Sequence, residues 1–289
     1  MARRDHLPVG GGPFVWKLAS FLDGEPERIA DYAKMQGWAF IAPKLVNESG
    51  KPRTADIRVA LKVRELGVRV IPWAYVHPST RLDELGIVAV ELDEKCVMLN
   101  AEKEWKNILD SIAAGYMERA RSLFGARAII LSTFAQESLH GTFPYHGFLT
   151  GNSACDAFGG QLYSGSPANQ LREATATAAK YGVENCHALR LYKGDGLTDK
   201  AKIEANWKAV LPEAQKQRCF MWWEGALAVR DFPEALTDFT DSGWTPQPLP
   251  PDEVSGNSGQ LTASQRAMLN EGLADIETGA GKIQEALGE

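Results

Sequence analysis

The chain has 289 residues, of which 44% are hydrophobic and 24% are charged, so it can bury a large core. Its net charge of -6 and the lack of a Lys/Arg run disfavour nucleic acid as a partner. No stretch reaches the roughly 18 apolar residues of a membrane span, and MARRDHLPVGGGP lacks the apolar core of a secretory signal. We therefore expect no membrane partner and a cytoplasmic location, or release by cell lysis.

Alternating strand-like and helix-like segments occupy residues 14 to 240. Eight segments are predicted strands: Phe14–Phe21, Ala39–Leu45, Arg69–Val76, Lys95–Asn100, Ala128–Thr133, Ala157–Tyr163, His187–Tyr192 and Cys219–Trp223. Helical patterns lie between them: Glu25–Gln36, Ala55–Leu66, Leu82–Leu92, Trp105–Phe124, Asn169–Tyr181, Lys200–Lys216 and Phe232–Thr240, with a short turn at Phe143–Leu149.

Glycine follows four of these helices, at Gly37, Gly67, Gly125 and Gly182, where it can adopt the left-handed conformation that ends a helix. Repeated strand–helix units require right-handed parallel crossovers, and eight of them favour an α/β fold, the closed (β/α)8 TIM barrel. The alternative is an open doubly wound sheet. However, no GxGxxG motif follows the first predicted strand, and the Gly10–Gly12 run precedes it.

The composition divides the chain into four parts. Residues 1–13 form an N-terminal arm, 14–244 the barrel, 245–261 a linker rich in Pro, Gly and Ser, and 262–289 a C-terminal helix. Thr262 and Gln265 form a capping box, and apolar residues recur at spacings of three and four after it. Three glycines weaken this helix as an autonomous coiled coil, so we expect it to dock onto the barrel, a second copy of the chain or another partner.

The four cysteines are far apart and form no CxxC pair. Each lies in or beside an apolar run, which predicts small buried thiols rather than metal ligands or a disulfide: Cys96, Cys155, Cys186 and Cys219.

No metal or cofactor is predicted. His77 and His187 are too isolated for metal-ligand spacing, and Ser132 lacks the GxSxG elbow of a serine hydrolase.

The active sites of TIM barrels gather where the strands end. The predicted strand ends here are rich in aromatic and amide side chains, which suits carbohydrate, because rings stack on sugar C–H faces and amides bond to hydroxyl groups. Some of these rings can instead cap the core. The candidate substrate-binding residues are Lys44, Trp73, Tyr75, Asn100, Gln161, Tyr163, Tyr192 and Trp223.

Glu102 is the first catalytic candidate. Side chains alternate along a strand, so Met98, Asn100 and Glu102 share one face, which turns from apolar to acidic at its end. A carboxyl group at a barrel mouth can act as a general acid. The alternative is that Glu102 and Glu104 only lead into the next helix, whose dipole favours acidic residues.

Glycoside hydrolysis usually needs a second carboxylate. Glu224 is the predicted partner, although the fourth and eighth strands lie on opposite sides of the barrel, and Asp23 and Asp195 are weaker candidates. Lys44 can pair with Glu102, bind substrate or, as the least favoured reading, form a Schiff base.

The chain resembles a group of (β/α)8 proteins of actinobacteria and their phages, distantly similar to the family 25 (Chalaropsis-type) lysozymes. The resemblance covers residues 14 to 240 and rests on FVWKLASFLDGEPERIADYAKMQGWAFIAPKL, VIPWAYV, VMLNAE, CDAFGGQLYSG and NQLREATATAAKYG. It implies that Glu102 matches the proton donor of the lysozymes. Asn100 stands where they have an aspartate, and their first-strand aspartate has no counterpart in Lys17, Ala19 or Ser20.

Two hypotheses follow. The first is a hydrolase of peptidoglycan or another polysaccharide, with Glu102 and Glu224 as its carboxylates and with the phage association that the resemblance implies. The second is a barrel without catalysis that binds glycan or builds a virion, with assembly through the C-terminal helix.

Overall fold

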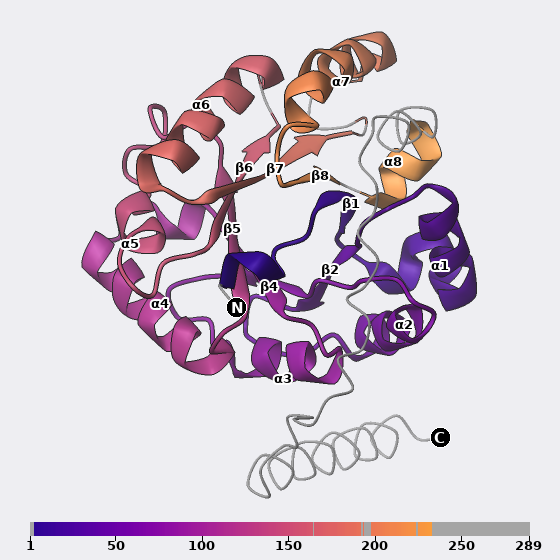
Figure 1. Ribbon diagram of the computed structural model, residues 1–289, viewed down its shortest axis with the longest axis horizontal. Coiled ribbons are helices and arrows are strands. Elements are labelled where there is room, and N and C mark those ends of the chain that lie inside the picture. The colour runs from indigo at the N-terminus through magenta and orange to yellow at the C-terminus, as the bar shows by residue number, and fades with distance from the viewer. Residues whose placement is uncertain (1–2, 164, 192, 194–197, 224, 233–289) are drawn as a thin grey trace, which may run out of the picture. The chain divides into compact units, whose positions relative to one another are not determined.

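The computed structural model describes residues 3–163, 165–191, 193, 198–223 and 225–232. Eight parallel strands form a closed barrel in chain order, in which β8 pairs with β1 (Figure 1). The predicted TIM barrel is confirmed. The strands are β1 (Gly10–Val15), β2 (Ala42–Val46), β3 (Trp73–Val76), β4 (Cys96–Ala101), β5 (Ala128–Phe134), β6 (Ala157–Leu162), β7 (Glu184–Arg190) and β8 (Cys219–Trp223).

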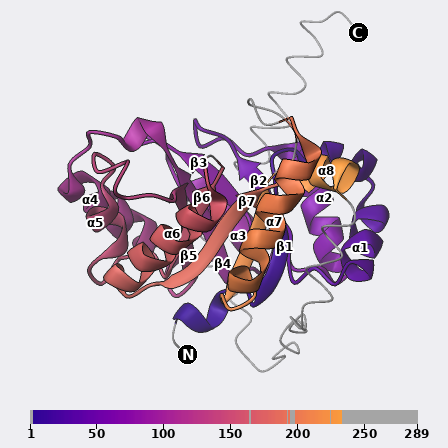
Figure 2. The same ribbon diagram turned by 90° about the horizontal axis from the view of Figure 1, so that it is seen from above.

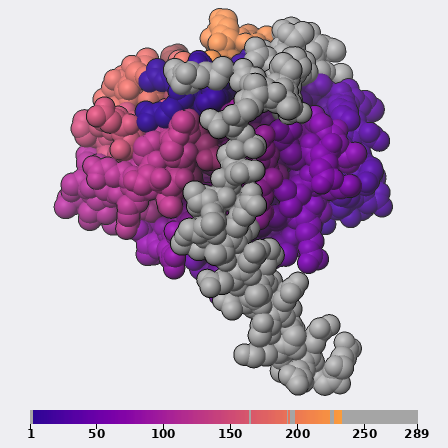
Figure 3. All heavy atoms as spheres, turned by 60° about the horizontal axis from the view of Figure 1, so that its bottom comes forward, coloured from indigo at the N-terminus to yellow at the C-terminus, as the bar shows by residue number. Residues whose placement is uncertain are grey.

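Helices surround this barrel as an outer ring (Figures 1 and 2). They are α1 (Pro26–Met35), α2 (Thr54–Glu65), α3 (Asp83–Glu91), α4 (Asp110–Phe124), α5 (Tyr145–Leu149), α6 (Pro167–Tyr181), α7 (Lys200–Ala214) and α8 (Gly225–Asp231). Figure 3 shows the adjoining purple and magenta surfaces of this ring. None of the helices in the described ranges is long and apolar enough to cross a membrane.

Some predictions fall outside the described residues. They are the linker, the C-terminal helix, and the helix Phe232–Thr240 beyond its first residue. Sequence patterns did not indicate α8, which begins directly after the last strand.

The first strand begins earlier than predicted. β1 starts at Gly10 and ends at Val15, because Gly10–Phe14 pair residue by residue with Cys219–Trp223 of β8. Gly12 allows this strand to approach its neighbour, since a Cβ atom there would lie 2.3 Å from the backbone oxygen of Phe40. The chain then leaves the sheet and forms the 3-10 segment η2 (Leu18–Gly24).

The predicted glycine stops are confirmed. Gly37, Gly67, Gly125 and Gly182 all have positive φ angles, between 58° and 87°. Residues with a side chain adopt this region at a cost, so glycine ends these helices and returns the chain towards the next strand.

Two apolar clusters hold the barrel. The inner cluster fills its interior and includes Phe14, Trp73 and Met98, whereas the outer cluster lies between strands and helices and includes Val97 and Leu99. Alternate residues of β4 therefore face opposite sides, as predicted.

The N-terminal end of the barrel is covered by η1 (Arg3–His6), as Figure 2 shows. Arg3 Nε lies 3.1 Å from Asp156 Oδ1, and Arg69 Nη2 donates to the His6 carbonyl oxygen over 2.6 Å. Leu7 joins the inner cluster. The functional residues must therefore be sought at the opposite end, where the strands finish.

The prediction of four free thiols is wrong for one pair. Cys186 and Cys219 form a disulfide, with their Cα atoms 4.7 Å apart. They occupy directly paired positions in β7 and β8, a proximity that their sequence separation of 33 residues hides. Cys96 and Cys155 are buried free thiols, as predicted.

Candidate functional site

A row of polar side chains crosses the C-terminal ends of three neighbouring strands. The register aligns Tyr75 of β3 with Asn100 of β4, and Asn100 with Ser132 of β5. Asn100 and Ser132 are buried, and Glu102 directly follows β4 in a half-buried position. Because inward-facing Met98 precedes Asn100 by two residues, this row lies on the inner face of the barrel.

Two amides hold the carboxylate of Glu102. Asn100 Nδ2 and Gln161 Nε2 each donate to Glu102 Oε1 over 3.0 Å. Gln161 Nε2 also lies 2.9 Å from Asn100 Oδ1 and 3.3 Å from Ser132 Oγ. The predicted residues Asn100, Glu102 and Gln161 thus form one hydrogen-bonded group, and Ser132 serves as an acceptor in it.

Lys44 lies beside this group, inside a ring of aromatic side chains. Its Nζ is 3.8 Å from the centre of the Trp16 ring and 5.7 Å from those of Trp73 and Tyr75. Only 2% of Lys44 is exposed, and this burial lowers the pKa of the ammonium, while the charge of Glu48 opposes the shift. The direct ionic partner of Lys44 is Glu48, and Glu102 acts on it only as a neighbouring charge.

Tyr75 stands among three carboxylates. Its hydroxyl donates to Glu104 Oε2 over 2.7 Å. Burial raises the pKa of Tyr75, the hydrogen bond to Glu104 raises it further, and so do the negative charges of Glu102 and Glu48. The phenol therefore stays protonated and can donate a hydrogen bond at neutral pH.

The aromatic residues differ in what they can contact. Trp73 is fully buried, its Nε1 donates to the Ala42 carbonyl oxygen over 2.9 Å, and its ring packs against Phe14. It therefore supports other rings and has no exposed face for a sugar. Four rings at this end are only half-buried, those of Trp16, Tyr75, Tyr163 and Trp223.

Sequence reasoning missed two residues at this end of the barrel, Trp16 and Glu48. The predicted first strand, Phe14–Phe21, contains Trp16, yet this residue directly follows β1 and shares the inward direction of Phe14. Glu48 was not singled out, although it follows Lys44 by four residues at the end of β2. A correct end for the first strand would have pointed to Trp16.

Other residues that the sequence analysis considered stand apart from the group. Asp23 is exposed in η2 and pairs with Arg28. His187 is fully buried, where its Nδ1 accepts a hydrogen bond from the Gly160 amide over 2.9 Å. Glu224, Tyr192 and Asp195 lie outside the described residues, so their roles stay predictions. Among the described residues, no group of three or more His, Cys, Asp or Glu is placed to hold a metal ion.

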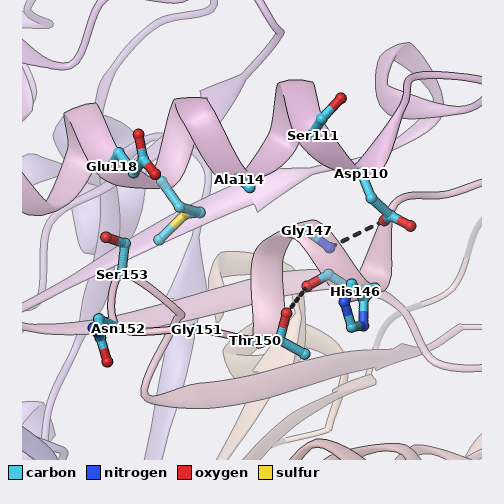
Figure 4. Close-up of a pocket in the computed structure, with 11 residues that line it drawn as sticks. Asp110, Ser111, Ala114, Glu118, His146, Gly147, Thr150, Gly151, Asn152 and Ser153 are labelled. Carbon is cyan, nitrogen blue, oxygen red and sulfur yellow. Dashed lines mark hydrogen bonds between the residues drawn. The ribbon is translucent and has the colours of Figure 1, made fainter.

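A separate groove of about 400 Å³ lies on the flank, between α4, α5 and the loop before β6 (Figure 4). Asp110 Oδ1 accepts from the Gly147 amide there, and Thr150 Oγ1 donates to the His146 carbonyl oxygen. None of the predicted site residues lines this groove.

No protein-family model matches the chain, and no curated protein matches it as a relative. Similar solved structures include the Pseudomonas stutzeri endoglucanase Cel5A, at 12% identity and a TM-score of 0.58, covering 85% of this chain and 98% of that one. Active domain 2 of a Pyrococcus furiosus chitinase matches at 10% identity and 0.57, covering 82% and 95%. The Bacillus cereus spore cortex-lytic enzyme SleL matches at 11% identity and 0.52, covering 81% and 74%.

These neighbours are glycoside hydrolases, and at such identities the likeness shows the fold alone. The chain therefore has the closed TIM-barrel fold that these three hydrolases share.

Proposed function

We propose that the barrel mouth binds a polysaccharide and hydrolyses its glycosidic bonds, with Glu102 as the general acid. The supporting observation is the placement of Glu102 at the inner end of β4, with Oε1 held by Asn100 and Gln161. Within the described residues no hydrogen bond involves Oε2, which leaves that oxygen for a substrate. A fixed carboxyl group beside a bound sugar meets the geometric need of proton transfer.

The surroundings also suit a glycan. The half-buried rings of Trp16, Tyr163 and Trp223 offer faces for sugar C–H groups, and amides offer directed hydrogen bonds. Peptidoglycan is the first polysaccharide to test, because the sequence resembles family 25 lysozymes and SleL is a cortex-lytic enzyme. The resemblance makes cell walls of actinobacteria, the hosts of the related phages, the preferred source.

The test compares the wild type with Glu102→Gln on peptidoglycan sacculi, chitohexaose and cellohexaose. We expect the variant to lose about 10²–10⁴-fold in the release of reducing ends, because the amide cannot donate the proton. Circular dichroism and the unfolding midpoint should stay unchanged. An unchanged rate in a folded variant would refute the assignment.

A second candidate is a barrel that binds glycan without cleaving it. Asn100 favours it, because an amide can neither take up a proton nor carry negative charge beside an oxocarbenium-like centre. This candidate predicts saturable binding to one of the three glycans with no reducing ends released. Asn100→Asp would then test whether a second carboxylate restores cleavage.

Deletion of Thr262–Glu289 would test the proposed role of this segment in assembly. The measurement is the molar mass of the particle in solution by light scattering, with and without the segment.

A further inference from the structure

We propose that Glu48 supplies the second carboxylate of the reaction and acts as its general base, opposite Glu102. This inference rests on the proposed glycoside hydrolysis. It differs from the sequence-based choice of Glu224, and the two assignments can be separated by experiment.

The strand order favours Glu48. It follows β2, Glu102 follows β4, and only β3 lies between these strands. Neighbouring strands lie about 4.8 Å apart, so the two backbones are separated by about 10 Å. Side chains that extend inward from such positions can place carboxyl groups at the roughly 6.5–9.5 Å of inverting glycosidases. Glu224 follows β8, four strands away from β4.

Two residues link Glu48 to Glu102. Lys44 pairs directly with Glu48 and also experiences the charge of Glu102, and Tyr75 of the intervening strand experiences both. Glu104 is a poorer candidate, because its Oε2 already accepts the Tyr75 hydroxyl and it follows the same strand as Glu102.

The loop that carries Glu48 is held firmly. Asn47 Oδ1 accepts hydrogen bonds from the backbone amides of Ser49 and Lys51, both over 3.0 Å. Thr80 Oγ1 donates to the Glu48 carbonyl oxygen over 2.8 Å. Gly50 has a φ of 78°, and a Cβ atom there would lie 2.8 Å from the Arg81 carbonyl oxygen. Such anchoring keeps a catalytic side chain in place before substrate binds.

The environment suits a base. Burial raises the pKa of Glu48, but the hydrogen bond and charge of Lys44 outweigh it, so the pKa is lowered and the carboxylate stays ionised. The Glu48 side chain is 42% exposed, so water can reach it. The ion pair with Lys44 weakens Glu48 as a base, yet it keeps the Glu48 carboxylate ionised and therefore able to accept a proton.

The step balances without a cofactor. Glu48 takes a proton from water, whose oxygen bonds to the anomeric carbon as the bond to the leaving oxygen breaks. Glu102 gives its proton to the leaving oxygen, which departs as a hydroxyl group. The proposal therefore predicts products of inverted anomeric configuration.

The experiment uses the full chain and whichever of the three glycans the wild type cleaves. Glu48→Gln and Glu48→Ala are compared with Glu204→Gln, a matched control, because Lys200 and Glu204 form an exposed pair with the same four-residue spacing. We expect both Glu48 variants to lose about 10²–10⁴-fold in kcat while circular dichroism shows them folded at the assay temperature, and the control to keep its rate. Their unfolding midpoints should fall, because buried Lys44 loses its ionic partner. Sodium azide should restore turnover of Glu48→Ala and yield a glycosyl azide by mass spectrometry.

Each other outcome has a defined meaning. If Glu48→Gln stays within about twofold of wild type while Glu102→Gln loses activity, Glu48 is not the base and the hydrolase assignment stands. A loss in Glu224→Gln without one in Glu48→Gln, a loss without azide rescue, or retained configuration by NMR also overturns the proposal. If the wild type cleaves none of the glycans, the proposed function itself fails.

Discussion

Gln161, on β6, donates from Nε2 to Glu102 Oε1 at the end of β4, over 3.0 Å. The same nitrogen lies 2.9 Å from Asn100 Oδ1. The Gln161 amide therefore links β6 to β4 across β5, and it fixes the side chains of Asn100 and Glu102. Removal of the Gln161 amide should lower both the stability of the fold and the activity of the site.

Gln161→Leu should destabilise the fold by about 1–3 kcal/mol, because the buried Asn100 Oδ1 and Ser132 Oγ lose a donor. Urea unfolding measures the change. The exposed hydrogen bond of Ser138 provides the control, and Ser138→Ala should stay within about 0.5 kcal/mol. A Gln161→Leu variant as stable as the control would show that the network adds nothing to folding.

Lys44→Met should move the acidic limb of the kcat/KM profile to higher pH. The lysine lowers the pKa of Glu48, so without it the carboxylate takes up a proton at a higher pH than before. Because a general base works only when ionised, activity is lost earlier on acidification. The measurement is the pH dependence of glycan cleavage, and a limb that does not move would argue against Glu48 as the base.

Trp16→Ala should weaken glycan binding by about 0.5–1.5 kcal/mol, because a stacking face is lost. Isothermal titration with the cleavable glycan, in a Glu102→Gln background, measures the affinity. Tyr32→Ala provides the comparison, since Tyr32 is a half-buried ring that packs on Trp38 in the outer layer. Equal affinities for the two variants would remove Trp16 from the binding surface.

His187 predicts a pH dependence of stability. Burial lowers its pKa from 6.5 to about 3, so below pH 6.5 the unfolded chain binds a proton that the folded chain excludes. The stability from neutral His187 is thus complete above pH 6.5 and falls by up to about 1.4 kcal/mol per pH unit on acidification. The unfolding free energy of His187→Gln should fall less steeply on acidification than that of the wild type. The control is His146→Gln, at an exposed position, which should keep the slope of the wild type.

Reduction of the Cys186–Cys219 disulfide should lower stability by about 3–4 kcal/mol, given the loop of 33 residues that it closes. Unfolding with and without dithiothreitol measures the loss. Dithiothreitol should not change the stability of the Cys186→Ala/Cys219→Ala double variant, which has no such disulfide to reduce. Alkylation of the unreduced, denatured chain should modify Cys96 and Cys155 alone. Four modified cysteines would contradict the pairing.

The sequence by itself determined the architecture. Periodicity predicted eight strands and most of the helices between them, and the glycines at positions 37, 67, 125 and 182 marked where helices end, because these are local properties of short segments. It also placed Glu102 and Asn100 on one strand face, since alternation needs no tertiary information.

Only the tertiary structure decided which residues meet. Gln161 reaches Glu102, Lys44 pairs with Glu48 beneath Trp16, and Cys186 lies beside Cys219, in each case through loop connections and strand register that local patterns do not contain. Trp73 shows the same limit, because residue type predicts an aromatic ring but not whether closure of the barrel buries it.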